Sequence, residues 1–188
     1  RNPPELVTYD IAKNKITVVS KLVNNNIKKD DLSPPELLCW QSSNNDEVRG
    51  LFYAGHKSLQ APLVIMIHNG PFNQAYAGWP SKAHLLNRLG YHALYVNYRG
   101  SSGYGKDFLM SGKSSFGTKE AKDIFFAVEH LRTSGRISPY KLAIWGGGAG
   151  ASIALKTMDL FPYLFRLGIV VYPYSTLGQL IHLMVYLL

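Results

Sequence analysis

The pattern of apolar and polar positions changes near residue 61. Before that point, short apolar runs are separated by polar turns, which is typical of antiparallel strands with one exposed face. Two pairs of strands are predicted there: Leu6–Ile11 with Lys15–Ser20, and Glu36–Gln41 with Glu47–Tyr53. The polar stretch 24–35 ends in two prolines and predicts a linker between the pairs.

After residue 61, continuous apolar runs alternate with amphipathic stretches. Such runs are typical of strands buried on both faces, and the alternation predicts right-handed βαβ units. The expected strands are Pro62–Ile67, His92–Val96, Leu142–Trp145 and Leu167–Tyr172. The expected helices are Lys82–Leu89, Thr118–Arg132, a short one ending at Leu160, and the apolar stretch Leu177–Leu188. The predicted fold is therefore an α/β domain with a mostly parallel sheet and helices on both faces, preceded by a short β-hairpin.

Length and composition narrow the class of protein. The chain has 188 residues and 46% apolar residues, enough for one domain or for a domain plus a piece of another. A single cysteine, Cys39, excludes an internal disulfide framework and a cysteine-rich zinc site. His56, His84, His92 and His130 show no metal-ligand spacing, so neither a metal nor another cofactor is expected. No apolar window of about 18 residues and no signal-peptide pattern occurs, so we expect no membrane span and a cytoplasmic location.

The net charge of +8 is distributed unevenly. Residues 1–60 hold eight basic and seven acidic residues, whereas residues 61–188 hold twelve and five. The imbalance reflects scarce acids rather than a basic cluster, since the lysines at 28–29 are followed at once by aspartates at 30–31. A nucleic-acid partner is not expected, because such binding needs basic residues grouped on one face.

The richest candidate site is the glycine turn that follows the predicted strand Leu142–Trp145. Gly146 and Gly150 occupy the flanking positions of the G-x-S-x-G nucleophile elbow, in which a sharp strand-to-helix turn exposes the nucleophile. The central residue is Gly148 rather than serine. The same turn also matches the dinucleotide pattern G-x-G-x-x-G/A, but that interpretation needs an acid about 20 residues on, where 168–173 holds none.

Three segments in order resemble the prolyl oligopeptidase family of serine peptidases, especially its acylaminoacyl-peptidase and dipeptidyl-peptidase branches. They are Pro62–Pro71 (PLVIMIHNGP), Gly90–Gly105 with its NYRGSSGYG ending, and Lys141–Gly147 (KLAIWGG), preceded by Asp123. The match covers about residues 35–176. By the same resemblance, residues 1–30 are expected to be the end of a propeller-like β domain with its linker. Residues 31–188 are expected to be the N-terminal part of the catalytic domain.

The resemblance implies an α/β-hydrolase fold and hydrolysis of peptides by acyl transfer, with a peptide as substrate or ligand. The family's nucleophilic serine falls on Gly148, and its oxyanion-binding backbone N–H falls on Ala149. His68 and Asn69 fall in the oxyanion region, where Asn69 replaces a glycine. The remaining residues of the elbow frame are Gly146, Gly147 and Gly150. Arg99 lies in a structural loop earlier in the chain, and Asp123 is its expected carboxylate partner.

The triad of this fold runs Ser, Asp, His along the chain. After Gly148 the only acid is Asp159, in the helix that leaves the turn, and the only histidine is His182, which follows too closely. A second frame around Ser152 places that serine about one turn inside the helix. The sequence thus predicts an inactive, truncated peptidase-like chain. The alternatives are a non-catalytic peptide-binding or interaction protein, and a nucleotide-binding α/β domain.

Overall fold

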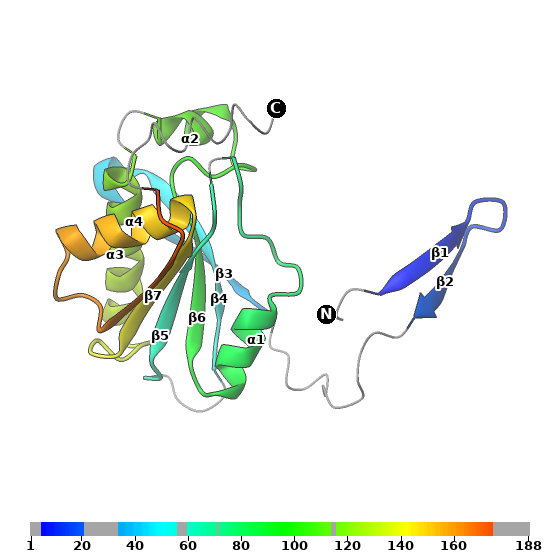
Figure 1. The fold of residues 1–188 in the computed structure, drawn as a ribbon, viewed down its shortest axis with the longest axis horizontal. Coiled ribbons are helices and arrows are strands. Elements are labelled where there is room, and N and C mark those ends of the chain that lie inside the picture. Colours follow the sequence, from blue (N-terminus) through cyan, green and yellow to red (C-terminus); the bar gives the residue numbers. More distant parts are fainter. Residues whose placement is uncertain (1–4, 21–33, 56–59, 71, 114–115, 175–188) are drawn as a thin grey trace.

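A computed structural model describes residues 5–20, 34–55, 60–70, 72–113 and 116–174 (Figure 1). Within them, β1 (Leu6–Asp10) and β2 (Lys15–Ser20) form an antiparallel hairpin. The other described strands form one six-stranded sheet in the order β3-β4-β6-β5-β7-β8. Their bounds are β3 Glu36–Gln41, β4 Glu47–Tyr53, β5 Leu63–Ile67, β6 His92–Asn97, β7 Leu142–Gly147 and β8 Leu167–Val171.

The sheet is antiparallel at one end and parallel elsewhere. Strand β4 pairs antiparallel with β3 and with β6, whereas β6, β5, β7 and β8 pair in parallel. Parallel neighbours need crossover connections, and helices supply them. The described helices are α1 Ser81–Arg88, α2 Lys106–Ser111, α3 Thr118–Thr133 and α4 Ala149–Leu160.

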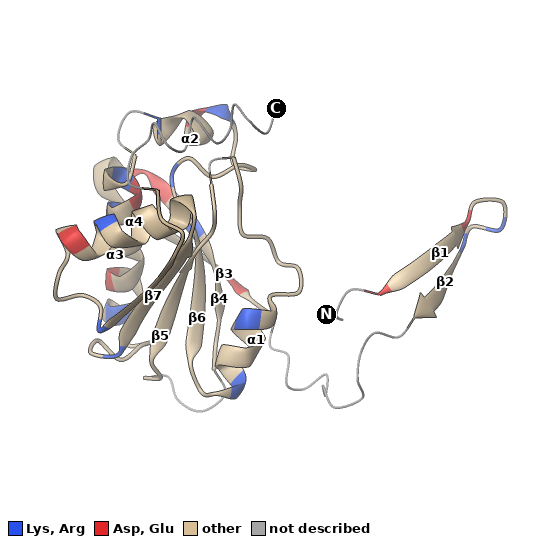
Figure 2. Ribbon diagram, in the orientation of Figure 1, with Lys and Arg blue, Asp and Glu red and all other residues tan. Residues whose placement is uncertain are grey.

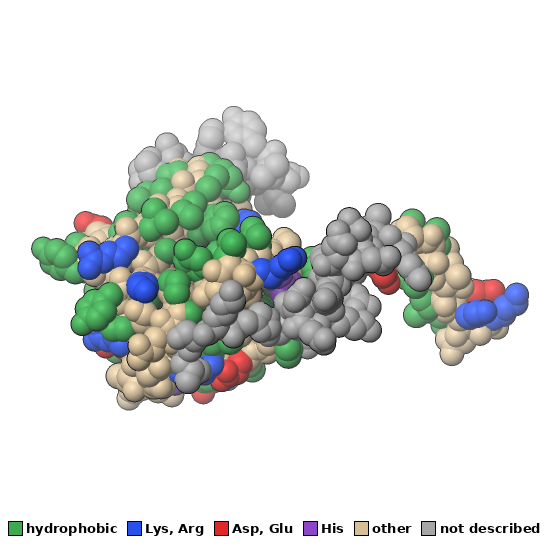
Figure 3. Space-filling view, turned by 90° about the horizontal axis from the view of Figure 1, so that it is seen from below, with side chains coloured by type: hydrophobic (Ala, Val, Ile, Leu, Met, Phe, Trp, Pro, Cys, Tyr) green, Lys and Arg blue, Asp and Glu red, His purple; other side chains and the backbone are tan. Residues whose placement is uncertain are grey.

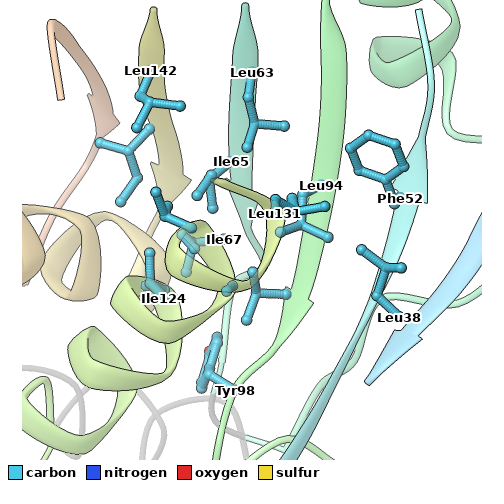
Figure 4. Packing of buried hydrophobic residues seen from close by; sticks show 14 of the residues in the cluster. Leu38, Phe52, Leu63, Ile65, Ile67, Leu94, Tyr98, Ile124, Leu131 and Leu142 are labelled. Carbon is cyan, nitrogen blue, oxygen red and sulfur yellow. The ribbon is translucent and has the colours of Figure 1, made fainter. Parts of the chain in front are cut away.

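Helices cover both faces of the sheet, as predicted. Helices α3 and α4 pack on one face, and α1 packs against β4 and β6 on the other (Figure 1). The larger core lies under α3 and α4, where Ile65 and Leu94 of the sheet meet Ile124 and Leu131 of α3 (Figure 4). The continuous apolar run of β5 is explained by this arrangement, since all five of its residues are buried.

The surface carries both charged and hydrophobic side chains. Basic and acidic residues are interspersed along α3 and α4 (Figure 2). Hydrophobic side chains are exposed on the face of the molecule seen from below (Figure 3). Among the exposed hydrophobic residues of the chain are Leu167 and Val171 of β8, the last strand of the described sheet.

The observed elements agree with the predicted strands and helices to within two residues at most ends, and two elements were missed. These are α2 and a 3-10 turn at Ser43–Asn45, which lie in stretches where no helix or strand was predicted. The predicted helix Leu177–Leu188 and residues 24–33 of the predicted linker lie outside the described residues. The division of the chain at residue 30 remains a prediction.

Candidate active site

The glycine turn after β7 has the geometry of a nucleophile elbow. Strand β7 ends at Gly147 and α4 begins at Ala149, so Gly148 alone separates them. Gly148 has φ 57° and ψ −124°, a backbone conformation that residues with a Cβ adopt only under strain. Its N–H donates a 3.0 Å hydrogen bond to the carbonyl oxygen of Val171, which fixes the turn against β8.

The two flanking glycines allow backbone to pack on backbone. A Cβ on Gly146 would lie 2.2 Å from the carbonyl oxygen of Gly150. A Cβ on Gly150 would lie 2.6 Å from the carbonyl oxygens of Ile67 and His68, at the end of β5. Neither position can hold a side chain unless backbone moves. The close packing at these two glycines brings the start of α4 against the end of β5.

Asn69 lies at this junction. Its Oδ1 accepts a 3.1 Å hydrogen bond from the backbone N–H of Ala149, the first residue of α4. The N–H groups in the first turn of a helix lack partners within the helix, so an acceptor here is favourable. The structure thus brings together three residues that the resemblance assigned to the nucleophile and oxyanion positions: Asn69, Gly148 and Ala149.

The His68 side chain is held by a different set of groups. Its ring stacks on Tyr98, with centroids 4.3 Å apart. Nδ1 lies 3.1 Å from the carbonyl oxygen of Asn69, so Nδ1 carries the proton, and Nε2 accepts from the Ser101 hydroxyl at 2.8 Å. Burial lowers the pKa of His68 to about 4, against a smaller opposing effect of the Asn69 carbonyl, so the ring is neutral at pH 7. The carbonyl oxygen of His68 lies against Gly150, while its ring contacts Tyr98, Ser101 and the carbonyl oxygen of Asn69.

Arg99 forms the expected ion pair with Asp123. Arg99 Nη2 lies 2.7 Å from Asp123 Oδ1, and the two side chains are 1% and 0% exposed. The backbone N–H of Arg99 and the Ser42 hydroxyl also donate to the Asp123 carboxylate, at 2.8 Å and 2.5 Å. Burial raises the pKa of Asp123, and the hydrogen bonds from Arg99 and Ser42 oppose that rise in part. This brace joins the loop after β3, the end of β6 and helix α3.

Sequence reasoning missed a second partner of Arg99 and a second loop anchor. Arg99 Nη1 also lies 2.6 Å from Asp46 Oδ2, a contact across 53 residues that no local pattern indicates. Asn97 is buried at the end of β6. Its Oδ1 accepts a hydrogen bond from the Ala75 N–H, and its Nδ2 donates to the Ala75 carbonyl oxygen and to the Tyr104 hydroxyl. Its place in the Asn-Tyr-Arg-Gly segment was the one available signal, because the resemblance had already marked that segment.

The side chains of the candidates Ser152 and Asp159 are engaged with other residues. The Ser152 hydroxyl donates to the carbonyl oxygen of Tyr174 at 2.7 Å and accepts from its N–H at 2.8 Å. Asp159 pairs with Lys156 and lies ten residues after Ala149, about 15 Å along the helix axis. His182 lies outside the described residues. The described part of the chain contains no cluster of three His, Cys, Asp or Glu side chains able to hold a metal. Among its helices, none is long and apolar enough to cross a membrane.

Comparison with protein-family models matches residues 78–180, more than half of the chain, to the prolyl oligopeptidase family. Over 107 residues the chain is 33% identical to the human acylamino-acid-releasing enzyme, covering 57% of this chain and 15% of the relative. It is 32% identical over 127 residues to dipeptidyl aminopeptidase BIII of Pseudoxanthomonas mexicana, covering 68% of this chain and 18% of the relative. The matched region is thus less than a fifth of either relative's length.

Solved structures show the same fold at lower identity. A puromycin-hydrolyzing peptidase of Mycobacterium tuberculosis superposes with a TM-score of 0.83 at 21% identity, covering 94% of this chain and 28% of that one. Pyrococcus horikoshii acylaminoacyl peptidase gives a TM-score of 0.76 at 24% identity, covering 92% and 28%. An acylaminoacyl peptidase in complex with Z-Gly-Gly-Phe-chloromethyl ketone gives 0.72 at 23% identity, covering 88% and 27%. These likenesses show an α/β-hydrolase fold.

Proposed function

The chain belongs to the prolyl oligopeptidase family, and on that premise we propose that it carries the nucleophile elbow of a serine-peptidase domain without the nucleophile. The observation that carries the proposal is the backbone of Gly148, with φ 57° and ψ −124° between β7 and α4. The backbone packs so closely at Gly146 and Gly150 that neither position has room for a Cβ, and this supports the same assignment. In this proposal residues 1–30 end a propeller-like β domain, and residues 31–188 begin the hydrolase domain.

Acyl transfer on this fold needs a hydroxyl at the tip of the elbow, a histidine to take its proton, a carboxylate to orient that histidine, and oxyanion donors. Glycine at position 148 offers no atom that can attack a carbonyl. Ser152 does not replace it, because its hydroxyl is engaged with Tyr174 from inside α4. The oxyanion donor Ala149 is retained, but a backbone N–H alone forms no acyl-enzyme. We therefore propose that the chain does not hydrolyse peptides.

The function left to such a frame is binding of a peptide without turnover. Peptides are the ligand class that the family supports, and one structural neighbour is described in complex with the peptidic Z-Gly-Gly-Phe-chloromethyl ketone. Glycine at position 148 also avoids the strain of about 1–3 kcal/mol that a residue with a Cβ would carry at this φ, so losing the nucleophile stabilises the turn. We do not propose nucleotide binding, because Val170, Val171 and Tyr172 at the end of β8 supply no carboxylate for a ribose.

The test compares turnover with binding. The chain is incubated with chromogenic acyl-amino-acid and dipeptidyl substrates, with the human acylamino-acid-releasing enzyme as the active control. Release of product at the buffer rate is expected, and turnover above it would contradict the proposed inactivity. Fluorescence polarisation with a labelled, N-terminally blocked tripeptide then tests binding. Saturable binding is expected, and its absence would refute the peptide-binding function while leaving the loss of the nucleophile in place.

A further inference from the structure

The Asn69 side chain occupies the space beside Gly148. A Cβ on Gly148 would lie 2.3 Å from Asn69 Oδ1, 2.8 Å from its Cγ and 3.1 Å from its Nδ2. The first two distances are shorter than real Cβ atoms show, so a side chain at position 148 and the observed carboxamide exclude each other. Any residue larger than glycine must displace Asn69 or move the turn.

The same carboxamide holds the oxyanion N–H. Asn69 Oδ1 lies 3.1 Å from the Ala149 nitrogen, and Ala149 itself is fully buried. Gly148, the N-cap residue of α4, has no side chain with which to cap the helix. An oxygen supplied by Asn69, just after β5, therefore satisfies one of the N–H groups that have no partner within the helix, at an end of the helix that favours negative charge.

We propose that Asn69 and Gly148 form an interlocked pair that keeps the elbow closed from within. The carboxamide oxygen of Asn69 sits where a substrate carbonyl oxygen would meet the Ala149 N–H, and its bulk fills the position of a nucleophile side chain. Asn69 thus caps α4 only because position 148 is glycine, and a serine placed there must displace the carboxamide that holds the Ala149 N–H. The oxyanion part of this inference rests on the proposed function, whereas the interlock rests on the contacts alone.

A double-mutant cycle tests the interlock through stability, with no need for activity. Gly148→Ser is made in the native chain and in Asn69→Ala, which removes all three crowding atoms. Gly135→Ser is the matched control, because Gly135 has a similar φ of 68° and a Cβ there would meet nothing within 4 Å. The equilibrium constant of unfolding is measured in urea for each variant. We expect the factor by which Gly148→Ser raises the equilibrium constant of unfolding to be roughly tenfold smaller in the Asn69→Ala background. The factor for Gly135→Ser should be the same in both backgrounds.

Equal penalties in both backgrounds, or the same relief at Gly135, would overturn the interlock. Should Gly148→Ser fail to fold, hydrogen exchange of the Ala149 amide decides the matter without it. Exchange is expected to rise roughly tenfold in Asn69→Ala and to stay slow in Asn69→Asp, which keeps an acceptor oxygen. Unchanged exchange in Asn69→Ala would refute the proposal. Turnover by the native chain, in contrast, would refute the proposed inactivity and leave these stability results standing.

Discussion

The buried brace between Arg99 and Asp123 allows a quantitative test of how the loops around the elbow are held. Replacing Arg99 with methionine leaves the Asp123 carboxylate, 0% exposed, without its cation. Removing one partner of such a buried pair costs about 3–5 kcal/mol of the free energy of unfolding, because the remaining charge is uncompensated. Urea unfolding at pH 7, followed by tryptophan fluorescence, measures this loss. Trp40 is one of the three tryptophans that contribute, and its indole N–H donates to the Asp123 carbonyl oxygen.

Two further variants separate the buried arm of the brace from its exposed arm. Asp46→Ala removes the partner whose side chain is 49% exposed, and its expected cost is about 1 kcal/mol or less. Asp123→Asn combined with Arg99→Met removes both buried charges, and its cost is expected to fall about 1–3 kcal/mol below the sum of the single costs. A cost of Arg99→Met no larger than that of Asp46→Ala, or additive costs of the two buried substitutions, would show that the buried ion pair does not hold these loops.

Three other variants test the buried carboxyl of Glu120, the hydrogen bonds of Ser152 and the tight packing at Gly146. Burial raises the pKa of Glu120 from 4.5 to about 7, so the folded state loses stability as the pH rises through that range. Glu120→Gln should remove roughly 3 kcal/mol of that loss. Urea unfolding of both proteins at the two ends of this pH range measures the difference. A native pH slope that Glu120→Gln leaves intact would show that another group titrates. Ser152→Ala should cost about 1–2 kcal/mol, because it leaves both backbone groups of Tyr174 without the hydroxyl; no change in the urea midpoint would count against this tether. Gly146→Ala should lower stability by about 3 kcal/mol, because its methyl group meets the carbonyl oxygen of Gly150; a calorimetric melting temperature equal to that of the native chain would disprove the tight turn.

Much of the fold follows from the sequence because its signals are local. The all-apolar run at β5 predicted a strand buried on both faces, and the burial of all five of its residues confirms this. The glycine spacing predicted a sharp turn at Gly148, which the positive φ confirms. Helix α2 was missed because none of its six residues is buried, so it carries no apolar periodicity to detect.

The contacts that complete the site are not local, and the sequence could not supply them. The resemblance placed Asn69 in the oxyanion region, but the atom that its carboxamide reaches belongs to a residue 80 positions later. Asp46 reaches Arg99 only because the loop between β3 and β4 folds over the end of β6. Such contacts depend on the register of the whole sheet rather than on any pattern in a short window.

Covalent labelling with a fluorophosphonate probe, read by intact-protein mass, shows whether any serine of the chain is an activated nucleophile. The probe reacts with activated serines, and the human acylamino-acid-releasing enzyme serves as the labelled control. We expect no change in the mass of this chain, because Gly148 between β7 and α4 offers no hydroxyl to the probe. An adduct on any serine would contradict that claim, and one on Ser152 would move the nucleophile into the first turns of α4.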